Sequence, residues 1–144
     1  MNISWRQATT EDKSWLMALR LKTMVPHLEK AGLFLSSEQH DFRMNEAFEC
    51  SHILSVDDIP CGLVKFCHDN DVIELQQLQI LPEFQGRGIG KAVLTRLSAL
   101  AGKVTLTVLK ENPALALYRR AGFVVTGEDE YEYHMEKITV ARGC

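Results

Sequence analysis

Apolar positions recur along the chain at two spacings, one typical of strands and one typical of helices. Seven short runs that alternate or are rich in β-branched residues predict strands at 3–9, 51–56, 61–67, 72–81, 103–109, 123–128 and 130–138. Asp57-Asp58 lies between the second and third runs, and Asp69-Asn70-Asp71 lies between the third and fourth. Tight acidic turns of this length predict that these three strands form an antiparallel meander.

Apolar residues at helical spacing, with cap and stop signals, predict four helices. The first helix is expected after Thr9 or Thr10, with Trp15, Leu16 and Leu19 on its apolar side, and the second after Ser36 or Ser37, with Phe42 and Phe48. The third is expected from Ile89 to near Gly102, and the fourth from Asn112-Pro113 to Gly122. The segment Met24 to Leu35 contains Pro26 and Gly32 and is predicted to be irregular.

The order of these elements restricts the topology. A helix lies between the strands at 72–81 and 103–109, so these two strands are expected to be parallel and joined by a right-handed crossover. The sequence therefore predicts an α/β (α+β) fold with a mixed sheet of about six to seven strands. The sheet is mostly antiparallel around one central parallel pair, with about four flanking helices. No linker tract interrupts the 144 residues, so one domain spanning 1–144 is expected.

Composition and charge exclude several classes of function. The net charge of −3 lacks the basic excess usual in nucleic-acid binders, so no nucleic-acid partner is expected. No leader pattern and no run of about 18 apolar residues occurs, so no membrane partner is expected and a cytoplasmic location is the default. The four cysteines form no CxxC pair and no metal-like grouping with the histidines, so no metal is expected. Cys61 and Cys67 are predicted to be reduced strand residues.

The stretch "LQILPEFQGRGIGKAVL" places three glycines within five residues, between a predicted strand and a predicted helix. The first N–H groups of a helix have no internal partner and carry a partial positive charge, which attracts phosphate. The loop from Gln85 to Lys91 is therefore a candidate phosphate cradle. The alternative is a tightened turn in which Arg87 and Lys91 are merely solvated. The spacing matches neither a dinucleotide fingerprint, which needs a glycine at Lys91, nor a P-loop.

The pattern Q-x-x-G-x-G formed by Gln85, Gly88 and Gly90, after the strand ending "LQILP", resembles the coenzyme A pyrophosphate loop of the GNAT superfamily of acetyl-CoA-dependent N-acetyltransferases. Downstream, "ENPALALYRRAGF" resembles the second half of that family's cofactor site, and "YHMEK" resembles its closing strand. The similarity covers roughly Val72 to Lys137. It implies a GNAT fold, acetyl-CoA as the acyl donor and a primary amine as the acceptor.

The resemblance also assigns roles to residues of this chain. The main chain of the glycine loop would wrap the cofactor diphosphate, at positions Gln85, Gly86, Arg87, Gly88, Ile89, Gly90 and Lys91. Backbone groups of Leu78 and Ile80 would bind the acetyl carbonyl and the pantetheine amides, with the Leu78 N–H as oxyanion donor. An N–H that faces a cofactor cannot also pair in the sheet, so a bulge or splay is expected beside this strand. Strand alternation is expected to place Glu74, Gln76, Leu78 and Ile80 on one face.

Three further side chains have both a functional and an ordinary interpretation. Glu74 matches the general base of some GNAT subfamilies, whereas others use water chains, and it can also be a solvated strand residue. Tyr118 matches the acid that protonates the departing thiolate, but its position also suits a core tyrosine. Asn112 suits a helix cap, and its counterpart in the family also touches pantetheine.

The acceptor remains open at this stage, with a small metabolite favoured and a peptide or protein N-terminus as the other choice. Arg20, Lys22 and His27 lie near the segment where GNAT proteins usually build the acceptor pocket, and His134 lies in a predicted strand. A homodimer is possible for this family. The rival functions are a non-catalytic acyl-CoA-binding sensor and an interaction protein that uses a sheet edge.

Overall fold

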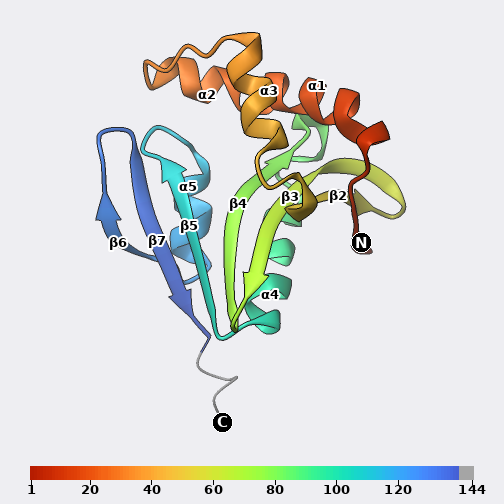
Figure 1. Ribbon diagram of the computed structural model, residues 1–144. Helices are drawn as coiled ribbons and strands as arrows, with labels where there is room; N and C mark the ends of the chain where they lie inside the picture. Colours follow the sequence, from red (N-terminus) through yellow and green to blue (C-terminus); the bar gives the residue numbers. More distant parts are fainter. Residues whose placement is uncertain (140–144) are drawn as a thin grey trace.

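The computed structural model describes residues 1–139 and contains the seven predicted strands in one sheet (Figure 1). The strands are β1 (Ile3–Gln7), β2 (Ser51–Val56), β3 (Ile59–Asp69), β4 (Val72–Ile80), β5 (Lys103–Leu109), β6 (Val124–Glu128) and β7 (Glu132–Ile138). The helices are α1 (Lys13–Thr23), α2 (Val25–Lys30), α3 (Ser37–Asn45), α4 (Ile89–Leu100) and α5 (Ala114–Arg120).

The sheet has the spatial order β1-β2-β3-β4-β5-β7-β6. Strands β4 and β5 are parallel, and every other neighbouring pair is antiparallel. The predicted meander of β2, β3 and β4 is confirmed, and its two turns use residues with positive φ at Asp57, Asp58, Asn70 and Asp71. The predicted mixed sheet with a central parallel pair is therefore confirmed.

Helices cover both faces of this sheet. The larger core lies between the sheet and α4, with Val93, Leu94 and Leu97 fully buried against strand residues such as Val104 and Ile73. A smaller core on the opposite face includes Leu16 and Leu19 of α1 and Met44 of α3. In Figure 1, α1, α2 and α3 lie together at one end of the sheet, and α4 and α5 lie behind it. The second face of β4, β5 and β7 is consequently left partly uncovered.

Helix α3 is fixed over the sheet by a buried lysine. Lys65 of β3 is only 2% exposed, and its ammonium group donates to the backbone oxygens of Arg43 (3.3 Å), Met44 (3.4 Å) and Glu46. These carbonyls lie at the end of α3, where the helix dipole is negative. Burial lowers the pKa of Lys65, while the nearby Glu46 acts in the opposite direction. At its other end, α3 begins with the predicted cap, since Ser36 accepts a bond from the Gln39 N–H.

The structure corrects two expectations in the N-terminal half. The segment predicted to be irregular contains the helix α2, because Pro26 falls in the first helical turn, where a missing N–H costs nothing. Phe48 lies outside α3, in the short 3₁₀ turn Phe48–Cys50, and Phe42 is 68% exposed rather than part of a core face.

A third correction concerns Cys67, which was predicted to be reduced. Cys67 on β3 forms a disulfide with Cys50, which directly precedes β2. The β2–β3 register pairs Ser51 with Lys65, so the hairpin brings the two cysteines to a Cα–Cα distance of 5.3 Å. Cys61 is a free thiol, and burial raises its pKa. Within residues 1–139, none of the helices combines the length and the apolar character needed to cross a membrane.

Candidate active site

The parallel strands β4 and β5 separate halfway along their length. Their pairing runs only from Val72–Lys103 to Leu75–Leu106, although β4 continues to Ile80 and β5 to Leu109. Figure 1 shows the two strands together at one end of the sheet and diverging toward α1 and α2. The splay predicted beside this strand is therefore present.

The end of β4 presents backbone groups to this gap. The Leu81 N–H donates to the Cys61 oxygen of β3 at 2.8 Å. Because backbone groups alternate along a strand, the N–H groups of Ile80 and Leu78 point the other way, toward the side from which β5 has departed. The Ile80 oxygen is bonded there by the Gln85 side-chain amide at 2.8 Å. Gln85 thus ties the start of the glycine loop to the end of β4.

A bulge in β4 overturns the expectation that Glu74, Gln76, Leu78 and Ile80 share a face. Lys65 of β3 pairs with Gln77, but the next residue, Phe66, pairs with Leu75, so Gln76 is an extra residue. An inserted residue shifts the alternation by one position. Leu78 and Ile80 consequently pack on the larger core, on the same side as Leu75. Glu74 and Gln76 lie on the opposite face, where the Gln76 amide donates to Glu74 Oε1 at 2.9 Å.

The glycine loop ends in an open helix start. Gly86 and Gly88 have φ of +77° and +81°, a left-handed conformation that L side chains rarely adopt. Among residues 1–139 no side chain caps the start of α4, and the first helical bond is that from the Ala92 N–H to the Gly88 oxygen at 3.1 Å. Gly90 serves packing instead, because a Cβ there would lie 2.9 Å from Leu117 Cδ2 of α5. The N–H groups before Ala92 therefore remain available at the helix start.

Helix α5 faces this loop across the gap. The Asn112 side-chain oxygen accepts a bond from the Ala114 N–H at 2.9 Å, so Asn112 caps the helix as predicted. Tyr118 is 7% exposed and packs edge-on against Phe123 at 6.0 Å between ring centroids. Burial raises the pKa of Tyr118 to about 12. The phenol is therefore protonated at neutral pH.

These elements enclose a donor cavity of about 840 Å³, within the range typical of small-molecule sites. The predicted cofactor residues that line it are Leu78, Ile80, Gln85, Gly86, Gly88, Ile89, Gly90, Lys91, Asn112 and Tyr118. Arg87 does not line it; its guanidinium lies over the Phe84 ring at 5.2 Å. His27 of α2 lines the same cavity.

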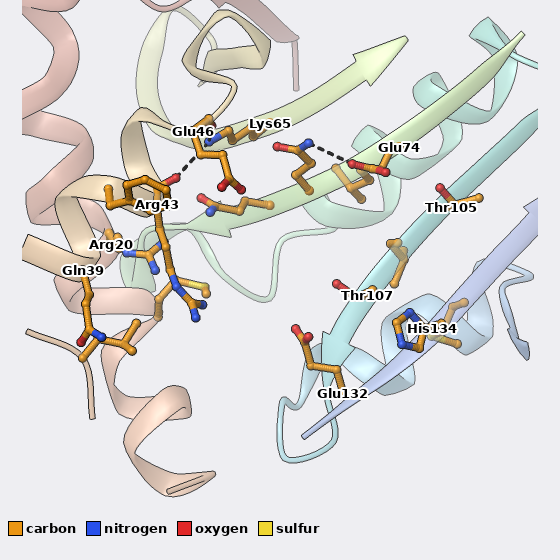
Figure 2. Close-up of a pocket in the computed structure, with 18 of the residues that line it drawn as sticks. Arg20, Gln39, Arg43, Glu46, Lys65, Glu74, Thr105, Thr107, Glu132 and His134 are labelled. Atoms are coloured by element: carbon orange, nitrogen blue, oxygen red, sulfur yellow. Dashed lines mark hydrogen bonds between the residues drawn. The ribbon is translucent and has the colours of Figure 1, made fainter. Parts of the chain in front are cut away.

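A second cavity, of about 1160 Å³, lies over the partly uncovered face of β4, β5 and β7. We call it the acceptor cavity. Figure 2 shows Glu74, Thr105, Thr107 and His134 on its strand side, and Arg20, Gln39 and Arg43 on its helix side. Glu74 lies here rather than in the donor cavity, and Met24 is the one residue of the described part of the chain that lines both. The two cavities thus meet near the end of α1 and are otherwise lined by different residues.

A family model described as an acetyltransferase (GNAT) domain matches residues 49–125, which is more than half of the chain. The protein belongs to the GNAT acetyltransferase family. The matched region includes β4, the glycine loop, α4 and α5, which contribute most of the residues that line the donor cavity. Comparison with curated protein sequences yields no match.

Solved structures share the GNAT fold at low sequence identity. The PaiA N-acetyltransferase from Thermoplasma acidophilum, solved in complex with coenzyme A, is 19% identical with a TM-score of 0.74, covering 96% of this chain and 99% of that one. An acetyltransferase from Thermus thermophilus is 20% identical with a TM-score of 0.74, covering 96% and 97%. The ribosomal-protein-S18-alanine N-acetyltransferase from Escherichia coli is 16% identical with a TM-score of 0.70, covering 96% and 94%.

The GNAT chain also contains site residues that sequence reasoning did not assign. Arg43 and Glu132 line the acceptor cavity, and the sequence analysis gave neither residue a role. Arg20 and His134 were noted without a role, and both line the same cavity. Lys22, which was noted beside Arg20, is exposed and lines neither cavity. The tertiary placement of α1, α3 and β7 brings these residues together, so a local pattern could not have revealed the cluster.

Proposed function

We propose that this GNAT protein transfers an acetyl group from acetyl-CoA to the primary amine of a small acceptor, by direct attack in a ternary complex. The observation that carries the proposal is the donor cavity, where an uncapped helix start and two outward-facing strand amides border one space. The helix start suits an anionic diphosphate at one end of a ligand, and the strand amides suit amide and carbonyl groups along its length.

The diphosphate would lie on the N–H groups at the start of α4. Gly86 and Gly88 let it approach the main chain, because an added Cβ at either position would project into open space. Lys91 on the first turn of α4 adds an exposed positive charge beside the cavity. The similar structure from Thermoplasma acidophilum was solved with coenzyme A, which agrees with this choice of ligand.

The pantetheine arm would then follow the gap between β4 and β5. The Ile80 N–H and the Asn112 side chain are available to its amides, and the Leu78 N–H is available to the thioester oxygen. That oxygen gains negative charge when the amine attacks, and one fixed N–H donor can be worth about 3 kcal/mol in the transition state. Holding both reactants in the gap supplies much of the remaining acceleration.

In the proposed reaction, the amine nitrogen forms a bond to the acetyl carbon and the carbon–sulfur bond breaks. The amine gives up a proton and coenzyme A leaves as a thiolate, which takes up a proton. Glu74 is the proposed acceptor of the amine proton, directly or through water. Its Oε1 is held by Gln76, and its other oxygen has no partner within residues 1–139. Tyr118 is the proposed hydrogen-bond donor to the sulfur from the opposite side of the gap.

A free-thiol release assay with acetyl-CoA and a panel of amino acids, polyamines, aminoglycosides and short peptides tests the proposal. Calorimetry with coenzyme A alone tests the donor cavity independently. Coenzyme A binding with thiol release on at least one amine supports the enzyme. Binding without release on any amine would favour the non-catalytic sensor, and no binding at all would refute the cavity assignment.

A further inference from the structure

Arg20 of α1 is a buried cation whose hydrogen bonds are incomplete. Its side chain is 3% exposed, and its Nε donates to His40 Nδ1 of α3 at 2.9 Å. The two terminal nitrogens, Nη1 and Nη2, are buried and have no hydrogen-bond partner within residues 1–139. Native proteins rarely leave such groups unpaired, and each case calls for a specific explanation, such as a catalytic role, an ordered water or an ion.

Neighbouring charges do not compensate this guanidinium. Burial is the main cause that lowers the pKa of Arg20, and the positive charge of Arg43 adds to it. Burial, followed by the charges of Arg20 and Arg43, also lowers the pKa of His40. His40 therefore stays neutral and accepts the Arg20 bond rather than neutralising it. Arginine keeps its charge in proteins, so the site holds a permanent cation that has no partner anion among residues 1–139.

The position of Arg20 gives this cation a role. Arg20 lines the acceptor cavity on its helix side, together with Gln39 and Arg43 of α3 (Figure 2). Glu74 and Glu132 project from β4 and β7 on the strand side of the same cavity. Glu38 and Glu46 also line the helix side of this cavity, and Lys65 lines its strand side. Lys65 is already bonded to backbone oxygens, whereas the terminal nitrogens of Arg20 have no acceptor within residues 1–139.

We propose that the acceptor is an amino-acid-like molecule whose carboxylate is bound by Arg20 and whose amine points toward Glu74. The proposal rests on the acetyl-transfer function above and specifies its substrate class. A carboxylate matches Nη1 and Nη2 in number and in planar geometry, and Arg43 can add a second positive charge. Carboxylate binding at the helix wall leaves the amine end of the molecule for the β4 wall, where Glu74 lies.

Nη1 and Nη2 are shielded in the structure, so the carboxylate reaches them only when a neighbouring side chain turns aside. Exposed side chains of the α3 region line the cavity on the same side as Arg20, among them Gln39, Phe42 and Arg43. Exposed side chains change rotamer within nanoseconds, so this adjustment does not limit the rate of binding. His40 meanwhile keeps the guanidinium plane fixed through its bond to Nε.

The first test uses the wild-type protein and matched pairs of acceptors that differ only in the carboxylate. Such pairs are lysine with cadaverine, ornithine with putrescine and phenylalanine with phenethylamine. We expect kcat/KM to favour the carboxylate member by about 10- to 160-fold, the factor typical of a charge-assisted bond. Dipeptides with the same residues show whether the carboxylate comes from a free amino acid or from a peptide C-terminus. Equal use of both members of every pair would overturn the inference while leaving the acetyl-transfer function intact.

The second test removes the cation. Arg20→Gln should reduce the preference ratio toward one and raise the KM for the amino acid more than that for acetyl-CoA. Arg20→Lys should restore part of the preference, because it retains the charge without the planar fork. Lys22→Gln on the same helix is the matched control and should leave the ratio unchanged. A ratio that survives Arg20→Gln would refute the assignment.

A direct binding measurement keeps the proposal testable if the Arg20 variants fail to fold. Calorimetry on wild-type protein loaded with coenzyme A compares the amino acid and the decarboxylated amine of each pair. Tighter binding of the amino acid supports the inference, and equal binding refutes it. If no amine of any kind releases thiol in the assay, the acetyl-transfer function itself fails, so the two failures are distinguishable.

Discussion

Removing the Tyr118 hydroxyl tests how much the proposed acid contributes. Burial raises the pKa of this phenol to about 12, whereas the departing thiol has a pKa of about 8.5, so complete proton transfer to the thiolate is uphill by about 3.5 units, or about 4.8 kcal/mol. We therefore assign Tyr118 the role of a hydrogen-bond donor to the leaving sulfur. The proton can reach the thiolate afterwards from water.

This role sets the size of the effect of Tyr118→Phe. A hydrogen bond to a charged group contributes about 1.5–3 kcal/mol, which corresponds to a decrease in kcat of about 10- to 160-fold. The KM for acetyl-CoA should change little, because the bond forms only as the sulfur gains charge. Stability should also change little, since the hydroxyl has no hydrogen-bond partner within residues 1–139 and the ring contact with Phe123 is retained.

The assay is thiol release at saturating acetyl-CoA and acceptor, between pH 6.5 and 9. An unchanged kcat would show that the hydroxyl does not act on the leaving group. A loss far beyond 10⁴-fold with normal cofactor affinity would contradict the hydrogen-bond role and require obligatory proton transfer. Either outcome would refute the reasoning from the raised pKa.

The same pKa gives a second readout of Tyr118 in the wild type. The unfolded chain releases the phenolic proton near pH 10, whereas the folded protein retains it to about pH 12. The stabilisation is therefore fully present below pH 10 and is lost as the pH rises to 12, by about 3 kcal/mol. Denaturant unfolding at pH 9 and pH 12 measures this loss, and Tyr118→Phe should lack that part of it.

Three further predictions concern the glycine loop, the proposed base and the disulfide. Gly88→Ala should weaken coenzyme A binding at least 10-fold by calorimetry. The control Gly32→Ala, with a similar φ of +85° and equally open space, should cost similar stability and leave coenzyme A binding unchanged. Equal coenzyme A affinities of the two variants would refute the assignment of the glycine loop as the phosphate site. Glu74→Gln should lower kcat at pH 7 by about 100-fold, and kcat should recover as the pH approaches the pKa of the free acceptor amine. An unchanged kcat at pH 7 would indicate that a water chain accepts the proton. Reducing the Cys50–Cys67 bond, with a sequence separation of 17, should lower the free energy of unfolding by about 3 kcal/mol in the loop-entropy model, and a melting temperature unaffected by reductant would argue against the bond.

Most of the sheet and the donor site could be predicted from local patterns. The strand periodicity and the helix between β4 and β5 were enough to predict the parallel pair, and the spacing of Gly86, Gly88 and Gly90 located the open helix start. Backbone conformation at such positions depends on the identity of the residue itself, so the sequence carries the signal directly. The strand, loop and helix were therefore identified in the right order.

Features that depend on register or on docking could not be predicted in this way. The bulge at Gln76 places Glu74 and Leu78 on opposite faces of the sheet. Nothing in a period-two pattern indicates where an extra residue will be inserted. The disulfide depends on the β2–β3 register in the same way. Arg20 reaches the acceptor cavity only because α1 and α3 pack together over the sheet. The cytoplasmic location and the homodimer stay predictions, which fractionation and light scattering can test.

The shift of face at Gln76 has a consequence for how this enzyme could diversify. Because Met24 is the only residue within 1–139 that lines both cavities, the residues proposed to select the acceptor can be exchanged without changing those proposed to hold the thioester. Each substrate would meet its own set of side chains, so a change in one set leaves the other in place. With these proposed roles, the bulge at Gln76 lets acceptor specificity change independently of cofactor binding.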